Sequence, residues 1–276
     1  MGLKKVLKKI IPSPIFKVKN YFFGPKKFVW FTFYQNWQDA ENDAEGYNAS
    51  DILEKCKSSL IKVRDGEAVY ERDSMLFDEI QYSWGLLAGL QKAAIEYGNE
   101  LCVLDFGGSL GSSYFQNKGF LEPLKNLEWC IVEQENFVKC GQEEFENDQL
   151  KFYYTISECL KEHKPNVLLL SSVIQYLADP ITWIKYFLSL DIPYIIIDRT
   201  AFTQDSQDLV CLQRVPDYIY HASYPCWFFE KERFIKHFQD KYNILGYFDS
   251  GYTHSQVLNG KKIYWDGLIL KRNEIS

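Results

Sequence analysis

Long apolar runs are missing from this sequence of 276 residues, and none approaches the roughly eighteen apolar residues that a membrane-spanning helix needs. The seven cysteines are scattered and odd in number, without a C-x-x-C pair or a Cys/His spacing typical of zinc. The histidines are dispersed, so we predict no metal site. We interpret Cys102 and Cys130, which lie in strand-like runs, as buried free thiols. Such thiols fit a reducing compartment, and we expect a cytoplasmic protein.

Acidic residues are absent from the head of the chain, where every charged residue before Asp39 is a lysine. The eight lysines of this head leave 23 basic residues against 37 acidic ones, so the rest of the chain carries a net charge of −14. Nucleic-acid binding needs a basic face that contacts phosphates. The charge of the main body therefore argues against a nucleic-acid partner.

The basic head, residues 1–27, begins with an amphipathic segment. Within residues 1–14 the apolar side chains fall on one helical face with lysines opposite, and Pro12 and Pro14 end the helix. One hypothesis is an interfacial helix on an anionic membrane, which would make the protein peripheral at the inner face of the cell membrane. The alternative is a solvated terminal helix that docks on its own domain or on a partner subunit.

A helical N-terminal extension or lid is predicted over residues 28–98. Asn48 or Ser50 would cap one helix, because asparagine and serine side chains accept hydrogen bonds from the first free amide groups. Asp73 would cap a second helix that ends before the first strand of the next region.

Residues 99–276 alternate short apolar strands with helix-length segments. This alternation, with strands buried on both faces, predicts an α/β fold built on a parallel, doubly wound sheet. We expect the segment 199–229 to be a long connection, followed by a helix near 230–241 and a terminal antiparallel hairpin. The predicted strands are 101–106, 128–133, 151–155, 166–171, 193–198, 243–249 and 262–270.

A glycine cluster follows the first predicted strand in the stretch "VLDFGGSLGSSYF". In a doubly wound sheet, ligands bind beyond the carboxyl ends of the strands where the strand order reverses. The cluster lacks the phosphate-cradling lysine of nucleoside triphosphatases. It also departs from the dinucleotide fingerprint G-x-G-x-x-G, because Ser109 and Ser112 stand at the second and third glycine positions counted from Gly107.

Two acidic residues end neighbouring strands beside this cluster. A carboxylate at Asp105 would oppose a pyrophosphate but suits a ligand with an amino group or a sulfonium. Glu133 ends the second strand, where a carboxylate can accept both hydroxyl protons of a ribose. Two strand-end acids with glycines between them favour S-adenosylmethionine over NAD as the cofactor.

With these residues, the sequence resembles the class I S-adenosylmethionine-dependent methyltransferases. It resembles more closely a group of methyltransferases encoded among bacterial surface-polysaccharide (O-antigen-type) genes. The matching stretches are "GEAVYERDSMLFDEIQYSW", "VLDFGGSLGSSYFQ", "LLLSSVIQYLADP", "IIIDRTAF" and "SYPCWFF", which cover most of the chain from about residue 30 onward.

The resemblance implies a Rossmann-like sheet of seven strands with the last one antiparallel. It implies a loop on the methionine side of the cofactor, formed by Asp105, Gly107, Gly108 and Gly111. It also implies that Glu133 holds the ribose and that Ser171 and Ser172 line the cofactor. One residue departs from the pattern, because Ser109 stands where the usual loop carries a glycine. Ser109 would therefore alter the approach of the backbone to the cofactor.

Several further residues could bind the cofactor or take part in the reaction. Arg72 would cover the cofactor's carboxylate, since its guanidinium suits carboxylates. Tyr176 would close over the sulfonium, or it forms the first buried turn of the next helix. His221 is the candidate base, because histidine titrates near neutral pH, or it is a histidine hydrogen-bonded in a packed loop. Asp198 and Arg199 would bind substrate, or they form an ion pair that pins the loop.

The stretch "VPDYIYHASYPCWFF" is expected to face the acceptor. Tyr224 and Trp227 are candidates for contact with substrate, and Trp227 would stack on a sugar ring. Packing is the alternative role for both residues. Cys226 lacks an evident base partner, so we interpret it as a packing residue.

The sequence therefore predicts methyl transfer from S-adenosylmethionine to a sugar, nucleotide-sugar or lipid-linked glycan acceptor in surface-glycan biosynthesis. A second hypothesis is a non-catalytic scaffold that keeps the fold and binds a partner in a polysaccharide assembly complex. A third is an NAD-dependent oxidoreductase, against which the broken fingerprint and Asp105 argue.

Overall fold

The computed structural model describes residues 30–45, 49–215, 221–250 and 255–274. The basic head and its amphipathic segment, residues 1–27, lie outside the described residues. Among the helices that are described, none is long and apolar enough to cross a membrane.

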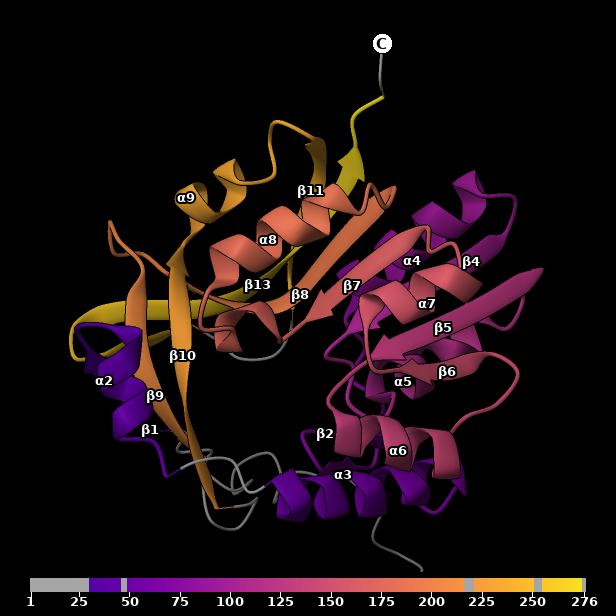
Figure 1. The fold of residues 1–276 in the computed structure, drawn as a ribbon, viewed down its shortest axis with the longest axis horizontal. Helices are drawn as coiled ribbons and strands as arrows, with labels where there is room; N and C mark the ends of the chain where they lie inside the picture. The colour runs from indigo at the N-terminus through magenta and orange to yellow at the C-terminus, as the bar shows by residue number, and fades with distance from the viewer. Residues whose placement is uncertain (1–29, 46–48, 216–220, 251–254, 275–276) are drawn as a thin grey trace, which may run out of the picture.

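The centre of the fold is a sheet whose strands follow the predicted alternation (Figure 1). Its first five strands in spatial order are parallel, and β13 is antiparallel to both of its neighbours. The spatial order is β6 (Leu150–Tyr153), β5 (Asn126–Val132), β4 (Glu100–Phe106), β7 (Val167–Ser171), β8 (Tyr194–Thr203), β13 (Lys261–Arg272) and β11 (Tyr242–Asp249). The predicted α/β class, the parallel core and the terminal antiparallel strand are thus present.

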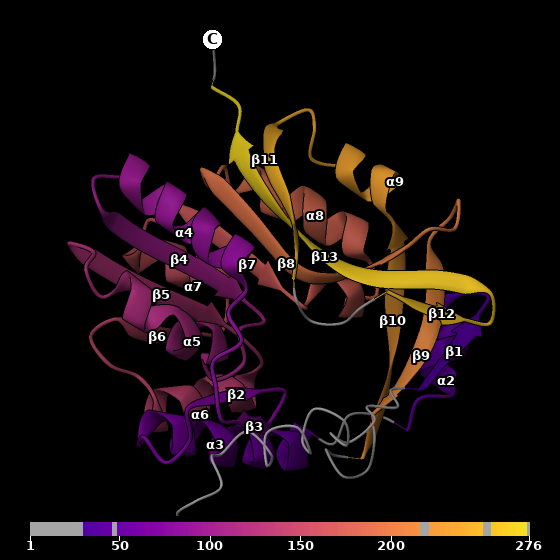
Figure 2. The ribbon, with the colours of Figure 1, turned by 180° about the vertical axis from the view of Figure 1, so that it is seen from behind.

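Helices cover both faces of this sheet, and so its strands are apolar on both sides. Successive residues of β7 alternate between the two layers: Leu169 packs with one hydrophobic cluster and Leu168 with the other. The layer seen from behind in Figure 2 contains α3 (Ala49–Arg64), α4 (Trp84–Glu96), α5 (Ser112–Leu121) and α6 (Glu135–Glu144). The other layer contains α7 (Ile156–Glu162), α8 (Pro180–Ser189) and α9 (Lys231–Lys236).

The predicted count of seven strands is wrong, because the described residues alone contribute eleven strands to the sheet. The segment 199–229, expected to be a connection, is mostly strand: β8 continues through Thr203, and two more strands follow it. Pro225 lies inside the second of these and is tolerated because that strand bonds to β8 only at Phe229 and Glu230. The added strands are β1 (Trp30–Tyr34), β9 (Leu209–Val215), β10 (Ala222–Glu230) and β12 (Gln256–Leu258).

Three of the added strands, β1, β9 and β10, form an antiparallel extension at one end of the molecule. The short helix α2 (Trp37–Asn42) lies on its outer side (Figure 1). Asn36 caps this helix by accepting a hydrogen bond from the backbone of Asp39 at 3.0 Å.

The N-terminal extension is less helical than predicted. The prediction that Asp73 caps a helix is wrong, because Asp73 and Ser74 form the tight turn of a hairpin, β2 (Tyr70–Arg72) and β3 (Met75–Phe77). Both turn residues have left-handed backbone angles, with φ of 52° and 63°, which suits a two-residue hairpin turn. The helix that follows, α4, begins only at Trp84.

Candidate functional site

The strand order of the sheet reverses between β4 and β7, since the chain runs outward from β4 to β5 and β6 and then returns to the other side of β4. Ligands of doubly wound sheets bind at this reversal, beyond the carboxyl ends of the strands. The structure brings most of the predicted cofactor residues to this edge of the sheet, because they end β4, β5 and β7 or follow them directly. We call this edge, at the carboxyl ends of β4, β5, β7 and β8, the crevice. Asp198 and Arg199 join them from β8, where Asp198 pairs with Ser171.

The loop after β4 depends on its glycines. A side-chain carbon on Gly108 would lie 2.6 Å from the carboxyl carbon of Asp105, and one on Gly107 would lie 2.6 Å from Val173 Cγ2. Gly107 and Gly111 also have positive φ angles of 73° and 104°, which glycine adopts without steric cost. The backbone of the loop is therefore pressed against the strand ends.

Ser109 takes a conformation that glycine favours. Its φ is 54°, and a non-glycine residue in this left-handed region costs roughly 1–2 kcal/mol. Its amide group donates a hydrogen bond to Glu133 Oε1 at 3.2 Å. This hydrogen bond joins the loop to the end of β5. Ser109 therefore adopts a backbone conformation that glycine favours, at the energetic cost of the left-handed φ.

Asp105 lies beneath the glycine loop and is fully buried. Trp129 Nε1 donates to Asp105 Oδ2 at 3.0 Å, whereas Asp105 Oδ1 has no hydrogen-bond partner among the described residues. Burial raises the pKa of Asp105 to about 7, and the hydrogen bond from Trp129 and the charge of Arg199 oppose the rise. The carboxyl is thus covered by the loop and not beside it.

Glu133 is half-buried and holds two backbone amide groups. Its Oε1 accepts from Ser109 and its Oε2 accepts from Gln134 at 2.6 Å. Burial raises the pKa of Glu133, and the two hydrogen bonds oppose the rise. Each carboxylate oxygen has a second lone pair, so the residue can still accept hydrogen bonds from hydroxyl groups.

Sequence reasoning missed Glu71, which the β2–β3 hairpin places against the start of α5. The side chain is 4% exposed, and it accepts hydrogen bonds from Ser112 Oγ and from the backbone amide of Ser74. Burial raises the pKa of Glu71, and Ser112 opposes the rise. The available signal is the two-residue turn in "YERDSM", a stretch that also resembles a helix start. Arg72 follows in the same strand, with its guanidinium over the ring of Phe77 at 5.2 Å.

Asp198 is buried with both carboxylate oxygens engaged. Ser83 Oγ donates to Oδ1 at 3.1 Å and Ser171 Oγ donates to Oδ2 at 3.2 Å. Arg199 Nε lies 3.4 Å from Oδ2, and the Arg199 guanidinium also donates to Ser171 Oγ at 2.9 Å. Burial raises the pKa of Asp198, chiefly against the charge of Arg199. This network fits the pinning role that the sequence left open for the pair.

The turn after β7 connects the crevice to the added strands. Ser172 has a φ of 57°, and its amide donates to the carbonyl of Asp198 at 2.9 Å. A short 3-10 turn follows (Ile174–Tyr176). The Tyr176 hydroxyl donates to Gln213 Oε1 at 3.1 Å, and its ring packs edge-on against Tyr224 at 5.2 Å. Tyr176 and Tyr224 therefore meet where the crevice joins β9 and β10.

Trp227 lines a cavity of about 580 Å³ on the outer side of the extension. Its ring stacks on Trp37 at 5.7 Å and 19°, and its Nε1 donates to the carbonyl of Leu177 at 3.1 Å. Polar side chains line the same cavity, among them Asn36, Asp39, Gln207, Asp208 and Lys261.

His221 lies directly before β10 with 74% of its side chain exposed. Its Nε2 is 3.0 Å from Glu45 Oε2, and the backbone amide of Glu45 donates to Ser223 Oγ at 2.8 Å. The structure thus places the candidate base beside a carboxylate from the segment that precedes α3, and not in a packed loop interior.

The charges of the crevice favour a cationic ligand group. Four carboxyl groups gather there, and Arg199 is the cation that lowers the pKa of three of them, namely Glu71, Asp105 and Asp198. A pyrophosphate would meet these acids with like charge, whereas an ammonium or sulfonium group would be attracted. The buried Oδ1 of Asp105, which has no hydrogen-bond partner among the described residues, also fits a ligand with such a group.

No protein-family model matches the chain, and no curated protein matches it. Among solved structures, it is similar to the N-terminal domain of EvdMO1 in the presence of SAH and D-fucose, with 12% identity, 78% of this chain and 96% of that one covered, and a TM-score of 0.46. A S-adenosylmethionine-dependent methyltransferase from Clostridium acetobutylicum has 12% identity, coverage of 69% and 92%, and a TM-score of 0.41. CalS10, an amino pentose methyltransferase from Micromonospora echinaspora, has 9% identity, coverage of 70% and 92%, and a TM-score of 0.40. At these identities and scores the likenesses carry no argument about function, which rests on the site itself.

Proposed function

We propose that this protein is a class I S-adenosylmethionine-dependent methyltransferase that acts on a hydroxyl group of a sugar or a sugar-linked acceptor. One observation carries the proposal: the carboxyl groups that end β4 and β5 contact a glycine loop at the reversal of the strand order, and Asp105 keeps an oxygen without a hydrogen-bond partner among the described residues beneath that loop. In S-adenosylmethionine the methyl group is bonded to a sulfonium, and a nucleophilic oxygen can accept that methyl group.

Different residues of the crevice would bind different parts of the cofactor. Glu133 would accept the ribose hydroxyl protons through its remaining lone pairs. The loop from Gly107 to Gly111 would contact the methionine portion through its backbone, and Asp105 would stabilise the positive charge there from below. Ser171 and Ser172 would line the opposite wall, and Arg72 would bind the carboxylate of the cofactor.

The acceptor would lie between the crevice and the extension. Tyr176 and Tyr224 offer an aromatic surface and hydroxyl groups at this junction, and Arg199 adds a cation. His221 would take the proton of the acceptor hydroxyl, with Glu45 Oε2 3.0 Å from its Nε2. Trp227 would hold a second part of a longer acceptor in the cavity on the outer side, where Trp37 is its neighbour.

The setting that we propose for this reaction is surface-glycan biosynthesis at the cytoplasmic face of the membrane. Nucleotide-sugars and lipid-linked glycans are the acceptors considered. The NAD hypothesis is disfavoured because a dinucleotide carries a pyrophosphate, which the acids of the crevice would oppose.

Calorimetric titration of the purified protein with S-adenosylmethionine, S-adenosylhomocysteine and NAD tests the cofactor. We expect the first two to bind, and Glu133→Gln to weaken both by about tenfold, the effect of losing a charged hydrogen bond of about 1.4 kcal/mol. The matched control is Glu135→Gln, two residues further along and in the first turn of α6, which should bind like wild type. No binding to folded protein would favour the scaffold hypothesis, and tight NAD binding would contradict the proposal.

Transfer of labelled methyl groups to a panel of sugars and nucleotide-sugars tests the acceptor. Transfer that requires Tyr176 and Tyr224 would support the proposed junction. Transfer to none of the panel by protein that binds the cofactor would contradict the sugar acceptor and leave the cofactor assignment intact.

A further inference from the structure

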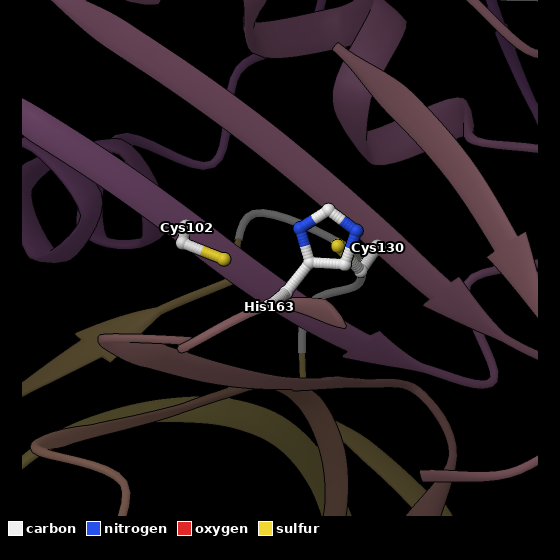
Figure 3. Close-up of side chains that lie close together, drawn as sticks. All are labelled: Cys102, Cys130 and His163. Carbon is white, nitrogen blue, oxygen red and sulfur yellow. The ribbon is translucent and has the colours of Figure 1, made fainter. Parts of the chain in front are cut away.

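A group of metal-binding side chains lies on the face of the sheet covered by α7. The donor atoms of Cys102 on β4, Cys130 on β5 and His163 at the end of α7 all lie within 4.8 Å of one another. Figure 3 shows the His163 ring next to the two sulfur atoms. Cys102 lies three residues before Asp105 on β4, or about 10 Å along the strand, so the group is separate from the crevice.

A third thiol lies in the same layer. Cys159 is fully buried in α7 and packs in the same hydrophobic cluster as Cys130, with Cys102 against that cluster. Cys159 lies in α7, and His163 is the residue that directly follows this helix. Three thiols and one imidazole form a Cys3His set, one of the ligand sets typical of structural zinc.

The surroundings of His163 also fit a metal ligand. Its Nδ1 lies 2.6 Å from Glu128 Oε2, the pairing with a carboxylate that usually orients a metal-bound histidine. Its Nε2 lies 2.7 Å from the hydroxyl oxygen of Tyr153. The Tyr153 hydroxyl also lies 2.9 Å from Glu162 Oε2. It can therefore donate its hydrogen bond to Glu162 when His163 Nε2 binds a metal.

The distances require only a small contraction. In a tetrahedral zinc site, ligand bonds of about 2.3 Å to sulfur and about 2.1 Å to nitrogen place the donor atoms roughly 3.6–3.8 Å apart. The three donors measured together lie within 4.8 Å, so they would close by about 1 Å around the ion. Side-chain rotations of the cysteines can supply this movement without a change in the strands.

We propose that Cys102, Cys130, Cys159 and His163 form a structural zinc site, with Glu128 as the positioning residue of His163. The ion would join β4, β5 and α7 on the face of the sheet that α7 covers. Because the ligands come from two strands and a helix that are far apart in sequence, no short spacing in the chain announces the site. The proposal is independent of the methyltransferase function.

The test is the metal content of the full-length protein, purified without chelators, together with cobalt substitution. We expect one zinc per chain, and for the cobalt form the intense visible bands of tetrahedral coordination with a thiolate-to-cobalt charge-transfer band. Cys130→Ser should lose the zinc and these bands. The matched control is Cys211→Ser, since Cys211 is equally buried and lies 3.3 Å from another thiol, Cys226, but belongs to no group of metal-binding side chains within the described part of the chain.

Two further measurements keep the proposal open to contradiction if Cys130→Ser does not fold. Glu128→Gln should weaken zinc binding by about 10- to 100-fold, as loss of an orienting carboxylate does elsewhere. A strong chelator should lower the melting temperature of wild type and leave that of His163→Gln unchanged. Wild-type protein without zinc that also binds no cobalt would overturn the proposal. Equal metal content in Cys130→Ser and Cys211→Ser, or bound copper in place of zinc, would overturn it as well.

Discussion

Replacement of Asp105 by asparagine tests the reasoning about the crevice most directly. The carboxyl is fully buried with one unpartnered oxygen, and burial raises its pKa to about 7 from an ordinary value of 3.8. The folded state therefore binds a proton more readily than the unfolded state. The resulting stability is fully present below about pH 4 and is lost as the pH rises through 7.

The size of the effect follows from the same linkage. Each pKa unit corresponds to about 1.4 kcal/mol, so between about pH 5 and pH 8 the free energy of unfolding should fall by about 3 kcal/mol because of Asp105 alone. The substituted asparagine cannot ionise, but its side-chain oxygen can still accept the hydrogen bond from Trp129. The difference in stability between wild type and Asp105→Asn should therefore change by about 3 kcal/mol over this range, with wild type losing stability as the pH rises.

Urea unfolding at a series of pH values, followed by circular dichroism, measures this difference. The other titrating groups contribute equally to both proteins and cancel. Asp148→Asn, at an exposed position, is the control and should give a flat difference. A flat difference for Asp105→Asn would refute the argument, because it would mean that water or a cation reaches the carboxyl and keeps it ionised throughout.

Three further outcomes are expected. Gly108→Ala should lower the free energy of unfolding by more than about 2 kcal/mol in the same urea assay, because the added carbon would lie 2.6 Å from the carboxyl of Asp105. The control is Gly119→Ala, where no atom lies within 4 Å of the added carbon, and this change should stabilise the protein by up to about 1 kcal/mol. Ser109→Gly should gain up to about 1 kcal/mol, since relief of the left-handed strain of about 1–2 kcal/mol exceeds the added entropy of an unfolded glycine. His221→Gln should lower the turnover of methyl transfer by about 10²- to 10⁴-fold and leave calorimetric binding of S-adenosylmethionine unchanged; unchanged turnover would exclude His221 as the base.

The sequence determined the central sheet and the position of the crevice. Runs such as "VLLLS" are apolar without interruption because both faces of their strands are buried, and this pattern is visible without a structure. The glycines and acids at the strand ends follow those runs directly, so their meeting at one edge could be predicted from the alternation of strands and helices. The fold class and most of the proposed cofactor residues come from this local information.

Tertiary structure decided what the chain does between those runs. The strand β10 contains a proline and a run of consecutive aromatic residues, and only its pairing with β9 and the end of β8 makes it a strand. Glu71 enters the crevice because Asp73 and Ser74 turn the chain in a hairpin, which a short apolar segment does not distinguish from a helix start.

The same holds for the depth of Asp105 and for the cysteine group. How far a carboxyl is removed from water depends on the loop that covers it, and that loop adopts its path through contacts with residues distant in sequence. Cys102, Cys130 and His163 are separated by 28 and 33 positions, and only the packing of α7 on two adjacent strands brings their donor atoms together. The order of residues decides which side chains are apolar and where strands end, whereas contacts between distant segments set burial, pKa values and metal-binding geometry.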